Sequence, residues 1–211
     1  MKSLKLLTVS LVAFIMLAAN ISNAQKTETT VITTNNKTYK VTKEVFPQWS
    51  VAPFGGAIFP VATLSESFKP NGAFGLDVGA KINKEVGFYG KFGYYFMNSN
   101  RNGAPVGKYI EATVGPRYYF SSVNVKSQLF VDAGIGMYNF SQSSFVDPTS
   151  LTGATVAEIS DTKAGVNAGV GASIFLGQDV NLMVRTKYNT VFTEGGTTSF
   201  ITAATGIEFK F

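Results

Sequence analysis

The chain is dominated by long stretches in which apolar residues alternate with polar or small ones. In the last stretch, Ser199 to Phe211, the odd-numbered residues are largely apolar and the even-numbered residues are small or charged. Side chains on a β-strand point alternately to opposite faces, so a period of two indicates a strand with one apolar face. Antiparallel sheets commonly carry this alternation. The rest of the chain must therefore supply partner strands of the same kind.

Eight stretches carry this alternation, and we expect each to form one strand. They are Trp49 to Val61, Ala73 to Ile82, Val86 to Met97, Lys108 to Phe120, Gln128 to Asn139, Ala164 to Leu176, Val180 to Phe192 and Ser199 to Phe211. Each is about twice as long as an average globular strand, and is long enough to cross an apolar layer about 25 Å thick when tilted. In the first stretch, Pro53 and the pair Gly55-Gly56 predict a bulge or a bend, which leaves the facing of its side chains open.

The connections between these stretches alternate in length. Those after the second, fourth and sixth strands are short: Asn83 to Glu85, Ser121 to Ser127 and Gly177 to Asp179. Those after the first, third, fifth and seventh are longer: Ala62 to Gly72, Asn98 to Gly107, Phe140 to Lys163 and Thr193 to Ser199. Short turns at one end and longer loops at the other are typical of outer-membrane barrels. The sequence therefore predicts an all-β fold, an eight-stranded antiparallel up-and-down transmembrane β-barrel over residues 48–211.

Residues 1–24 have the features of a secretory signal peptide. Lys2 and Lys5 give a charged start, Leu6 to Ala19 is apolar, and small residues at the end of the segment predict cleavage before Gln25. The alternative is an N-terminal membrane anchor, but the apolar run is shorter than the ~20 residues that a spanning helix needs. We therefore expect export and cleavage.

Residues 25–47 are polar and differ from the stretches that follow. Two short stretches around a turn at Asn35 to Lys37 predict a small hairpin. If these were two more membrane strands, the barrel would have ten strands, but Lys43 would then share a face with Tyr39 and Val41. We therefore expect residues 25–47 to be a periplasmic extension.

Charge and cysteine content exclude several other classes of protein. Loss of the signal peptide leaves 16 Lys and Arg against 13 Asp and Glu, so the net charge falls from +5 to +3. No run of basic residues indicates a nucleic-acid partner. The chain has no cysteine, so neither a disulfide framework nor a thiolate metal site is expected. No later segment has the ~18 consecutive apolar residues of a helical span.

The charged residues of the strands gather on the face opposite the apolar one. In a soluble sandwich they would face solvent, whereas in a membrane barrel the apolar face meets lipid and the charges face one another. Strand length and the export signal favour the membrane barrel. Buried charges are tolerated only when paired, and an eight-stranded barrel is just wide enough for side chains to fill. We expect a salt-bridge network that fills the periplasmic half of the lumen, formed by Asp77, Lys91, Glu111, Arg117, Asp132, Arg185, Lys187 and Glu208. A proton or ion path along these charges is the functional alternative.

The turns predict which of these charges are neighbours. The three-residue turn Asn83 to Glu85 places Asp77 opposite Lys91 on the next strand. A four-residue loop between the fourth and fifth strands places Arg117 opposite Asp132. Both pairs bring opposite charges together on the inward face, as a paired interior requires.

The turn Gly177 to Asp179 predicts the position of the Arg185 side chain. If Leu176 pairs with Val180, Arg185 lies opposite Gly171. A glycine leaves room for a long side chain, so we expect Arg185 to reach Glu208 on the closing strand.

No pattern in the sequence indicates catalysis, and no catalytic residue is assigned. The chain has no histidine, which is the usual general base for a serine nucleophile or an activated water. The expected cationic partners of the inward carboxylates also argue against carboxylate catalysis. The glycines of Gly165 to Gly177 alternate at period two and precede no helix, so they do not form a phosphate loop.

No cofactor or metal site is expected. The longest loop contains Asp147, Glu158 and Asp161, which could attract a divalent cation. Their spacing does not match an EF-hand loop, so solvated loop residues are the favoured interpretation.

The strand ends carry aromatic residues and an aromatic terminus. Aromatic side chains form girdles at the two membrane interfaces of transmembrane barrels, and the residues in the corresponding places are Trp49, Phe96, Tyr118, Phe120 and Phe192. The ending of the closing strand resembles the C-terminal assembly signal of bacterial outer-membrane barrels. The resemblance implies recognition by the barrel-assembly machinery through Ile207, Phe209 and Phe211.

From Trp49 to Phe211 the chain resembles the small eight-stranded outer-membrane β-barrel family, similar to the transmembrane domains of OmpA and OmpX. The signal peptide, the eight strands and the terminal Phe211 carry this resemblance. It implies a porin-family β-barrel in the cell outer membrane of a Gram-negative bacterium, with outer-membrane lipids around it, loops outside and termini in the periplasm. No peptidoglycan-binding domain follows Phe211, so cell-wall tethering is not expected.

The resemblance implies two functional hypotheses. The first is a structural or surface-interaction barrel with a charge-plugged interior, in which the loop 140–163 contacts extracellular ligands. The alternative is a narrow conduit for small or hydrophobic solutes, as in OmpW-like barrels. The first is favoured, because paired charges would fill the lumen.

Overall fold

The computed structural model describes residues 28–34, 37–43, 46–101, 103–120, 127–146, 155–177 and 179–211. The expected signal peptide and its cleavage point lie outside these residues. Within the described ranges, no helix combines the length and apolar character that crossing a membrane requires.

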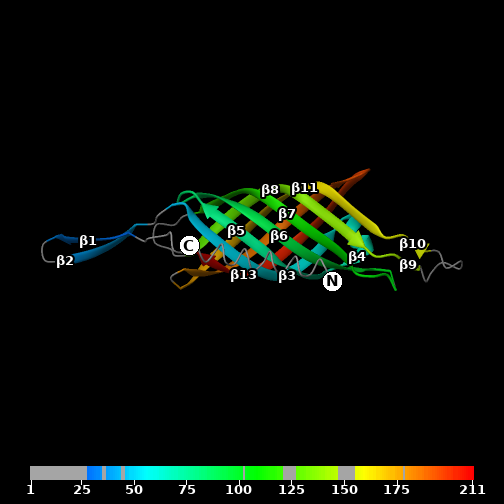
Figure 1. The fold of residues 1–211 in the computed structure, drawn as a ribbon, viewed down its shortest axis with the longest axis horizontal. Coiled ribbons are helices and arrows are strands. Elements are labelled where there is room, and N and C mark those ends of the chain that lie inside the picture. Colours follow the sequence, from blue (N-terminus) through cyan, green and yellow to red (C-terminus); the bar gives the residue numbers. More distant parts are fainter. Residues whose placement is uncertain are drawn as a thin grey trace, which may run out of the picture.

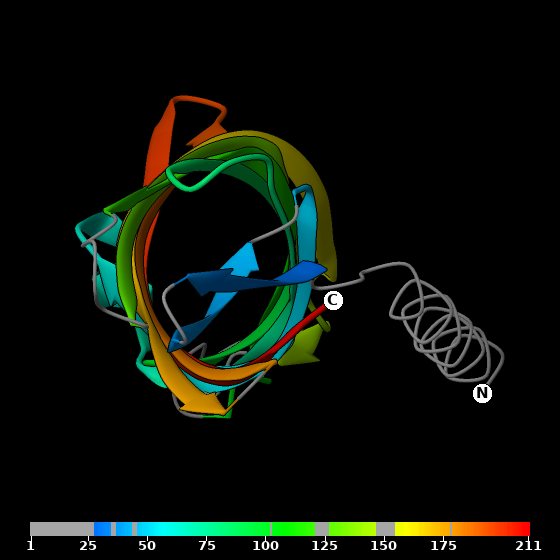
Figure 2. The same ribbon diagram turned by 90° about the vertical axis from the view of Figure 1, so that its left-hand side faces the viewer.

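Eight long antiparallel strands form a closed barrel (Figure 1, Figure 2). They are β3 (Gln48–Val61), β5 (Asn71–Lys81), β6 (Val86–Ser99), β7 (Gly107–Phe120), β8 (Gln128–Gln142), β11 (Ile159–Gly177), β12 (Val180–Thr193) and β13 (Gly196–Lys210). Each strand pairs with the next one in the chain, and β13 pairs with β3 to close the ring. The predicted eight-stranded antiparallel up-and-down barrel is therefore confirmed.

The seam between the first and last barrel strands is completed by the chain terminus. The Phe211 N–H donates to the Trp49 carbonyl oxygen at 2.9 Å, and the Trp49 N–H donates to the Phe211 oxygen at 3.3 Å. Along the seam, a Cβ on Gly56 would lie 2.1 Å from the Ala203 carbonyl oxygen. Only glycine therefore permits this approach of β3 to β13.

Of the bulge or bend predicted in the first strand, the bulge is wrong. The register of β3 with β5 runs without a shift from Gln48 opposite Lys81 to Ile58 opposite Asn71. The facing that the sequence left open is also resolved. The even-numbered residues of β3 point inward, and the buried ones are Ser50, Ala52, Phe54, Ile58 and Pro60.

One of the four longer connections is a tight turn instead. Thr193 pairs with Gly196, so only Glu194 and Gly195 join β12 to β13. Gly195 has φ +84°, a left-handed conformation that costs glycine little. The predicted loop was too long because Gly196 to Thr198, which lacks an apolar alternation, still pairs with β12.

The described residues of the connection predicted at Phe140 to Lys163 are largely strand. β8 and β11 continue to the pair Gln142 and Ile159. Beyond them, β9 (Phe145–Val146) pairs with β10 (Thr155–Val156). The predicted loop therefore forms a projecting antiparallel ribbon, and its residues 147–154 lie outside the described chain.

A short cap lies in the first long connection. It contains helix α2 (Thr63–Ser67) and strand β4 (Phe68–Lys69), which pairs with the end of β6. Asn100 Nδ2 donates to the carbonyl oxygens of Ser65 at 3.1 Å and Glu66 at 2.7 Å. These bonds hold α2 at what is called here the loop end of the barrel. The opposite end, with the short turns and the C-terminus, is called the turn end.

The turn between β11 and β12 differs from its predicted pairing by one residue. Val180 pairs with Gly177 rather than with Leu176, because a bulge follows Phe175. Inside the strands the expected register holds, with Arg185 opposite Gly171.

The N-terminal hairpin forms a sheet of its own. Strands β1 (Glu28–Thr34) and β2 (Lys37–Lys43) pair with each other and with no barrel strand that the structure describes. The ten-stranded alternative is therefore wrong. Figure 1 shows the hairpin beyond the turn end of the barrel.

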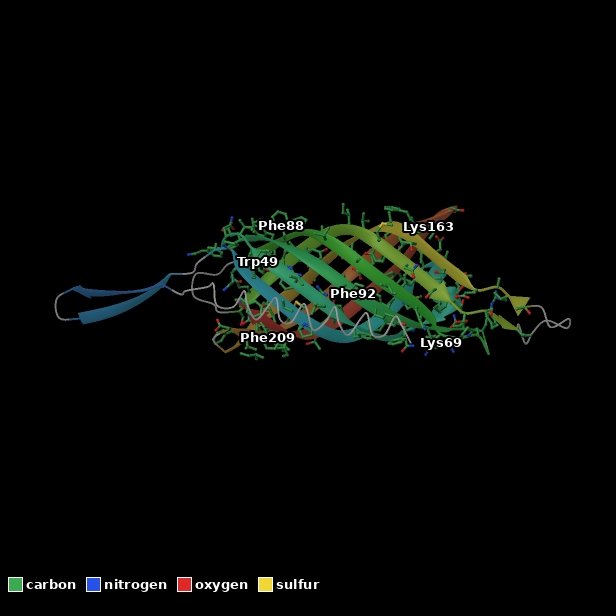
Figure 3. The ribbon with its side chains drawn as sticks, in the orientation of Figure 1. Trp49, Lys69, Phe88, Phe92, Lys163 and Phe209 are labelled. Atoms are coloured by element: carbon green, nitrogen blue, oxygen red, sulfur yellow. The ribbon has the colours of Figure 1, made fainter. Side chains whose placement is uncertain are left out.

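The wall of the barrel is apolar outside and carries charges inside. Large apolar side chains are exposed on its outer surface (Figure 3), among them Phe74, Phe88, Phe92, Leu129, Ile135 and Val170. Among the residues that the structure describes, five cations and four carboxylates are buried: Lys81, Lys91, Arg117, Arg185, Lys187, Asp77, Glu111, Asp132 and Glu208. This arrangement suits a lipid surrounding and would be costly in water.

Candidate functional site

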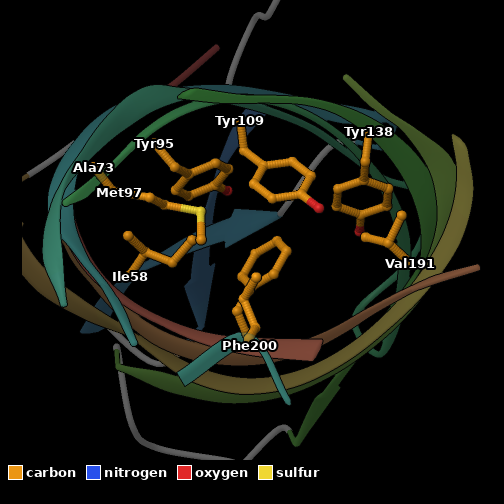
Figure 4. Packing of buried hydrophobic residues seen from close by; sticks show 9 residues of the cluster. Ile58, Ala73, Tyr95, Met97, Tyr109, Tyr138, Val191 and Phe200 are labelled. Atoms are coloured by element: carbon orange, nitrogen blue, oxygen red, sulfur yellow. The ribbon is translucent and has the colours of Figure 1, made fainter. Parts of the chain in front are cut away.

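The interior of the barrel is filled by side chains in layers. At the loop end lies an aromatic and aliphatic cluster (Figure 4) that includes Ile58, Leu64, Tyr95, Met97, Tyr109, Tyr138, Val191 and Phe200. Toward the turn end lies a second cluster of Ala52, Phe54, Tyr119, Phe130 and Met183. Between them is a layer of seven buried charged residues, called here the central charge layer: Asp77, Lys91, Glu111, Arg117, Asp132, Arg185 and Lys187.

Arg117 joins two carboxylates of the central charge layer. Its Nη2 lies 3.2 Å from Asp77 Oδ2 and 3.1 Å from Asp132 Oδ2. Its guanidinium carbon lies 4.4 Å from the ring centre of Phe130 and 5.0 Å from that of Tyr89. Ring faces attract cations, so both charge and stacking fix this side chain.

Arg185 contacts a residue on the other side of the lumen. Its Nη1 donates to Oδ2 of Asp77, the same oxygen that Arg117 contacts. Its guanidinium carbon lies 4.7 Å from the ring centre of Phe54. The space beside Gly171, which we expected Arg185 to use, is taken by Phe130: a Cβ on Gly171 would lie 2.3 Å from the Phe130 Cζ.

The expected contact between Arg185 and Glu208 is therefore wrong. Glu208 accepts a hydrogen bond from the Ser173 hydroxyl and another from Asn181 Nδ2 at 3.1 Å. Its carboxylate is buried near the turn end, apart from the central charge layer. Sequence reasoning missed both partners, because a hydroxyl and an amide give no charge signal.

Lys91 and Glu111 form another ion pair of the layer. Lys91 Nζ lies 2.9 Å from Glu111 Oε2, and the side chains of both residues are almost fully buried. The Tyr95 hydroxyl donates to the same oxygen, and Thr113 Oγ1 donates to Glu111 Oε1 at 2.9 Å. Both oxygens of this carboxylate therefore have partners inside the barrel.

Lys187 completes the layer on the side of β11 and β12. Its Nζ lies 3.0 Å from Asp132 Oδ1, 3.2 Å from Asn167 Oδ1 and 3.7 Å from the ring centre of Tyr89. The Tyr89 hydroxyl donates to Asn167 Oδ1 at 2.7 Å, and Asn167 Nδ2 donates to the Tyr138 hydroxyl at 3.1 Å. This chain of bonds connects the charges with the loop-end cluster.

The structure brings seven of the eight predicted network residues together. The predicted register pairs, Asp77 with Lys91 and Arg117 with Asp132, are both present. The ion pairs, however, mostly join residues that are not register partners. The layer lies between the two clusters rather than at the turn end alone, and its four cations outnumber its three carboxylates by one.

The turn end is also closed. Lys81 Nζ donates to Gln128 Oε1 at 2.8 Å and lies 4.8 Å from the ring centre of Tyr119. The space between these residues and Glu208 has a volume of about 10 Å³, no more than about one water molecule needs.

No cluster of candidate metal ligands occurs among the described residues. Of the loop acids considered from the sequence, Asp147 lies outside the described chain. Asp161 pairs with Lys163 at 3.2 Å, and Glu158 is exposed.

The aromatic residues expected at the interfaces face outward. Trp49, Tyr118, Phe120 and Phe192 are each 42–51% exposed, and Phe96 packs beside Phe74 and Tyr94 on the outer face. Figure 3 shows Trp49, Phe88 and Phe209 near the turn end. Ile207 and Phe209 also face outward, with exposed fractions of 37% and 42%. These positions fit the girdle of a transmembrane barrel.

A closed barrel with an apolar outer wall and a packed, ion-paired interior defines a small transmembrane β-barrel. No family model matches the sequence, and no curated protein matches it. Solved structures that it resembles include neisserial surface protein A (TM-score 0.57, 15% identity, 78% of this chain and 97% of that chain). Others are OprG of Pseudomonas aeruginosa (TM-score 0.55, 10% identity, 78% and 96%) and the N-terminal β-barrel domain of OprF from the same species (TM-score 0.51, 16% identity, 78% and 98%).

At these identities the likeness is one of fold. The fold of this chain is that of the small eight-stranded outer-membrane β-barrels, as the sequence resemblance implied.

Proposed function

We propose that this chain is an integral outer-membrane protein with a closed interior and a structural or surface-interaction role. The observation that carries the proposal is the central charge layer, packed between two apolar clusters. A continuous water path would have to cross both clusters and separate buried ion pairs, which costs several kcal/mol for each unpaired charge. The ion pairs therefore act as a plug in this proposal.

The proposed orientation places the turn end and the hairpin β1–β2 in the periplasm and the loop end outside. Outer-membrane lipids surround the apolar wall. The barrel-assembly machinery reads the closing strand through Ile207, Phe209 and Phe211. The positions of these residues support this role, since Phe211 completes the seam with Trp49.

The projecting ribbon of β8 and β11, with β9 and β10 at its end, is the proposed contact surface for extracellular partners. Among the labelled strands, β9 and β10 extend farthest beyond the barrel at the loop end (Figure 1). No catalytic step forms part of the proposal, because the chain has no histidine. Its buried carboxylates are held by cations, hydroxyls or amides.

Planar-bilayer recording tests the closed interior. We expect purified, refolded protein to give no steady channels, because the charge layer spans the lumen. Steady, sizeable conductance from pure protein would favour the alternative, a narrow conduit for small or hydrophobic solutes. Liposome swelling with small sugars provides a second measurement of the same property.

A further inference from the structure

At the loop end, the packed side chains stop below the rim and leave a cleft of about 280 Å³. It is lined by inward-facing residues of β7, β8, β11, β12 and β13, together with Leu64 of α2 and Phe68 of β4. Pockets for drug-sized ligands typically have volumes of about 300–1,000 Å³. This cleft therefore suits a small molecule, held at the mouth of a closed barrel.

Aromatic rings line much of this cleft. They belong to Phe68, Tyr109, Tyr138 and Phe140. The ring centres of Phe68 and Phe140 are 5.6 Å apart, and those of Tyr109 and Phe140 are 5.1 Å apart. Figure 4 shows the Tyr109 hydroxyl directed toward Tyr138 and Val191. The faces of such rings carry negative potential and attract cations.

One group of charged side chains at the rim, Asp161, Lys163 and Glu194, carries a net negative charge. Lys163 Nζ lies 3.2 Å from Asp161 Oδ2 and 2.8 Å from Glu194 Oε1. Two carboxylates therefore share one ammonium, which leaves one negative charge in excess within this group; Asp161 and Lys163 line the cleft, and Glu194 lies outside its lining. The side chains of Asp161 and Glu194 are 54% and 94% exposed, so both remain accessible to a ligand.

We propose that this cleft binds a small organic cation, a protonated amine or quaternary ammonium with an apolar body. The apolar body contacts the aromatic walls, and the cationic group lies between the ring faces and Asp161. An anion of the same size would be repelled by Asp161, and the Lys163 ammonium beside it is already paired with two carboxylates. This binding site goes beyond the proposed closed-barrel role and does not depend on whether the barrel conducts.

Three probes of nearly equal size test the charge preference: benzyltrimethylammonium, benzyl alcohol and benzoate. Each is titrated by calorimetry into the full-length protein in phosphatidylcholine nanodiscs, with empty nanodiscs as the blank. We expect the ammonium to bind about tenfold more tightly than the alcohol, and benzoate to bind least, since a cation–π contact with a partial ion pair contributes ~1–2 kcal/mol. Equal or tighter binding of benzoate, or no ammonium binding up to about 10 mM, would overturn the proposal.

Two rim variants should change the affinity in opposite directions. Asp161→Asn removes the excess negative charge, and we expect ammonium binding to weaken about fivefold. Lys163→Met leaves both carboxylates free, and binding should become tighter. If Asp161→Asn left the affinity unchanged, or Lys163→Met abolished binding, the cleft would not be a cation site.

Phe140→Leu in the cleft and the control variant Asp179→Asn at the turn end complete the test. Phe140→Leu removes one ring face while keeping an apolar side chain, so binding should weaken about threefold. Asp179→Asn makes the same chemical change as Asp161→Asn but at the turn end, and it should leave binding unchanged. Heat-modifiable migration on gels shows whether each variant has folded. A folded Phe140→Leu protein with unaltered affinity would argue against an aromatic contact.

Discussion

Arg185 on β12 and Asp77 on β5 form a buried ion pair across the barrel interior, although β13 and β3 separate their strands in the wall. The same carboxylate oxygen contacts Arg117 on β7. One aspartate thus connects strands from three parts of the ring. Its loss should affect the barrel as a whole rather than a single hairpin.

Asp77→Asn tests this connection. Two arginines would lose their shared counter-charge inside the lumen, and breaking a buried pair costs about 3–5 kcal/mol. We expect the free energy of unfolding in lipid vesicles, measured by urea titration, to fall by about that amount. Asp179→Asn, at an exposed turn, is the matched control and should change it by less than ~0.5 kcal/mol. Equal effects of the two variants would refute the role of Asp77.

Glu208→Gln tests the corrected partner of Glu208. A glutamine oxygen can accept the same bonds from Ser173 and Asn181, so the expected loss is only about 1 kcal/mol. The measurement is the same urea titration. A loss as large as that of Asp77→Asn would mean that Glu208 does serve as a counter-charge for a buried cation.

Arg117→Met tests the plug. The substitution removes a cation that contacts Asp77 and Asp132, leaving carboxylates without one of their partners. We expect a stability loss of about 3 kcal/mol or more and intermittent conductance in planar bilayers. If both stability and conductance matched the unmodified protein, the ion pairs would not close the lumen.

Gly56→Ala tests the seam. The added Cβ would lie 2.1 Å from a backbone oxygen of β13, and such overpacking costs about 1–3 kcal/mol. At the neighbouring Gly55 a Cβ meets nothing within 4 Å, so Gly55→Ala is the matched control. We expect reduced folding yield into vesicles for the first variant alone. Similar yields for both would show that β3 and β13 can move apart there at little cost.

Deletion of Phe211 tests the assembly signal. The deletion removes an outward aromatic terminus and two backbone hydrogen bonds with Trp49. We expect the fraction of heat-modifiable protein in outer-membrane preparations to fall severalfold, while Phe211→Tyr keeps it near normal. Assembly of the deletion variant at the normal level would remove Phe211 from the proposed signal.

The sequence predicts the wall of this barrel better than its interior. The strands of Asp77 and Lys91 are joined by a short turn, so the position of Asp77 opposite Lys91 follows from counting residues. Contacts across the lumen follow from the stagger of the closed barrel and from side-chain conformations. The sequence therefore could not show that Asp77 contacts Arg185, or that Phe130 fills the space beside Gly171.

The loops were the weakest part of the prediction for a similar reason. A polar segment such as Gly196 to Thr198 shows no apolar face, yet it pairs with β12 because the partner strand extends beside it. The same holds for residues 159–163 of β11, which pair with β8 beyond the apolar band. Pairing between two polar strands leaves little trace in the pattern of hydrophobic residues.

In its extension beyond the barrel, β11 has a strand edge on the side of β12 that no described strand pairs with. Residues 159–164 pair with β8, but among the described pairings β12 joins β11 only from Gly165 onward. Unpaired backbone groups of this kind can template the addition of a strand from another molecule. Here the edge carries Ser160, Asp161, Thr162 and Lys163 in succession, and charged, polar edges resist such pairing. The extended β8–β11 side of the wall can therefore project beyond the rim without promoting strand pairing between copies of the protein.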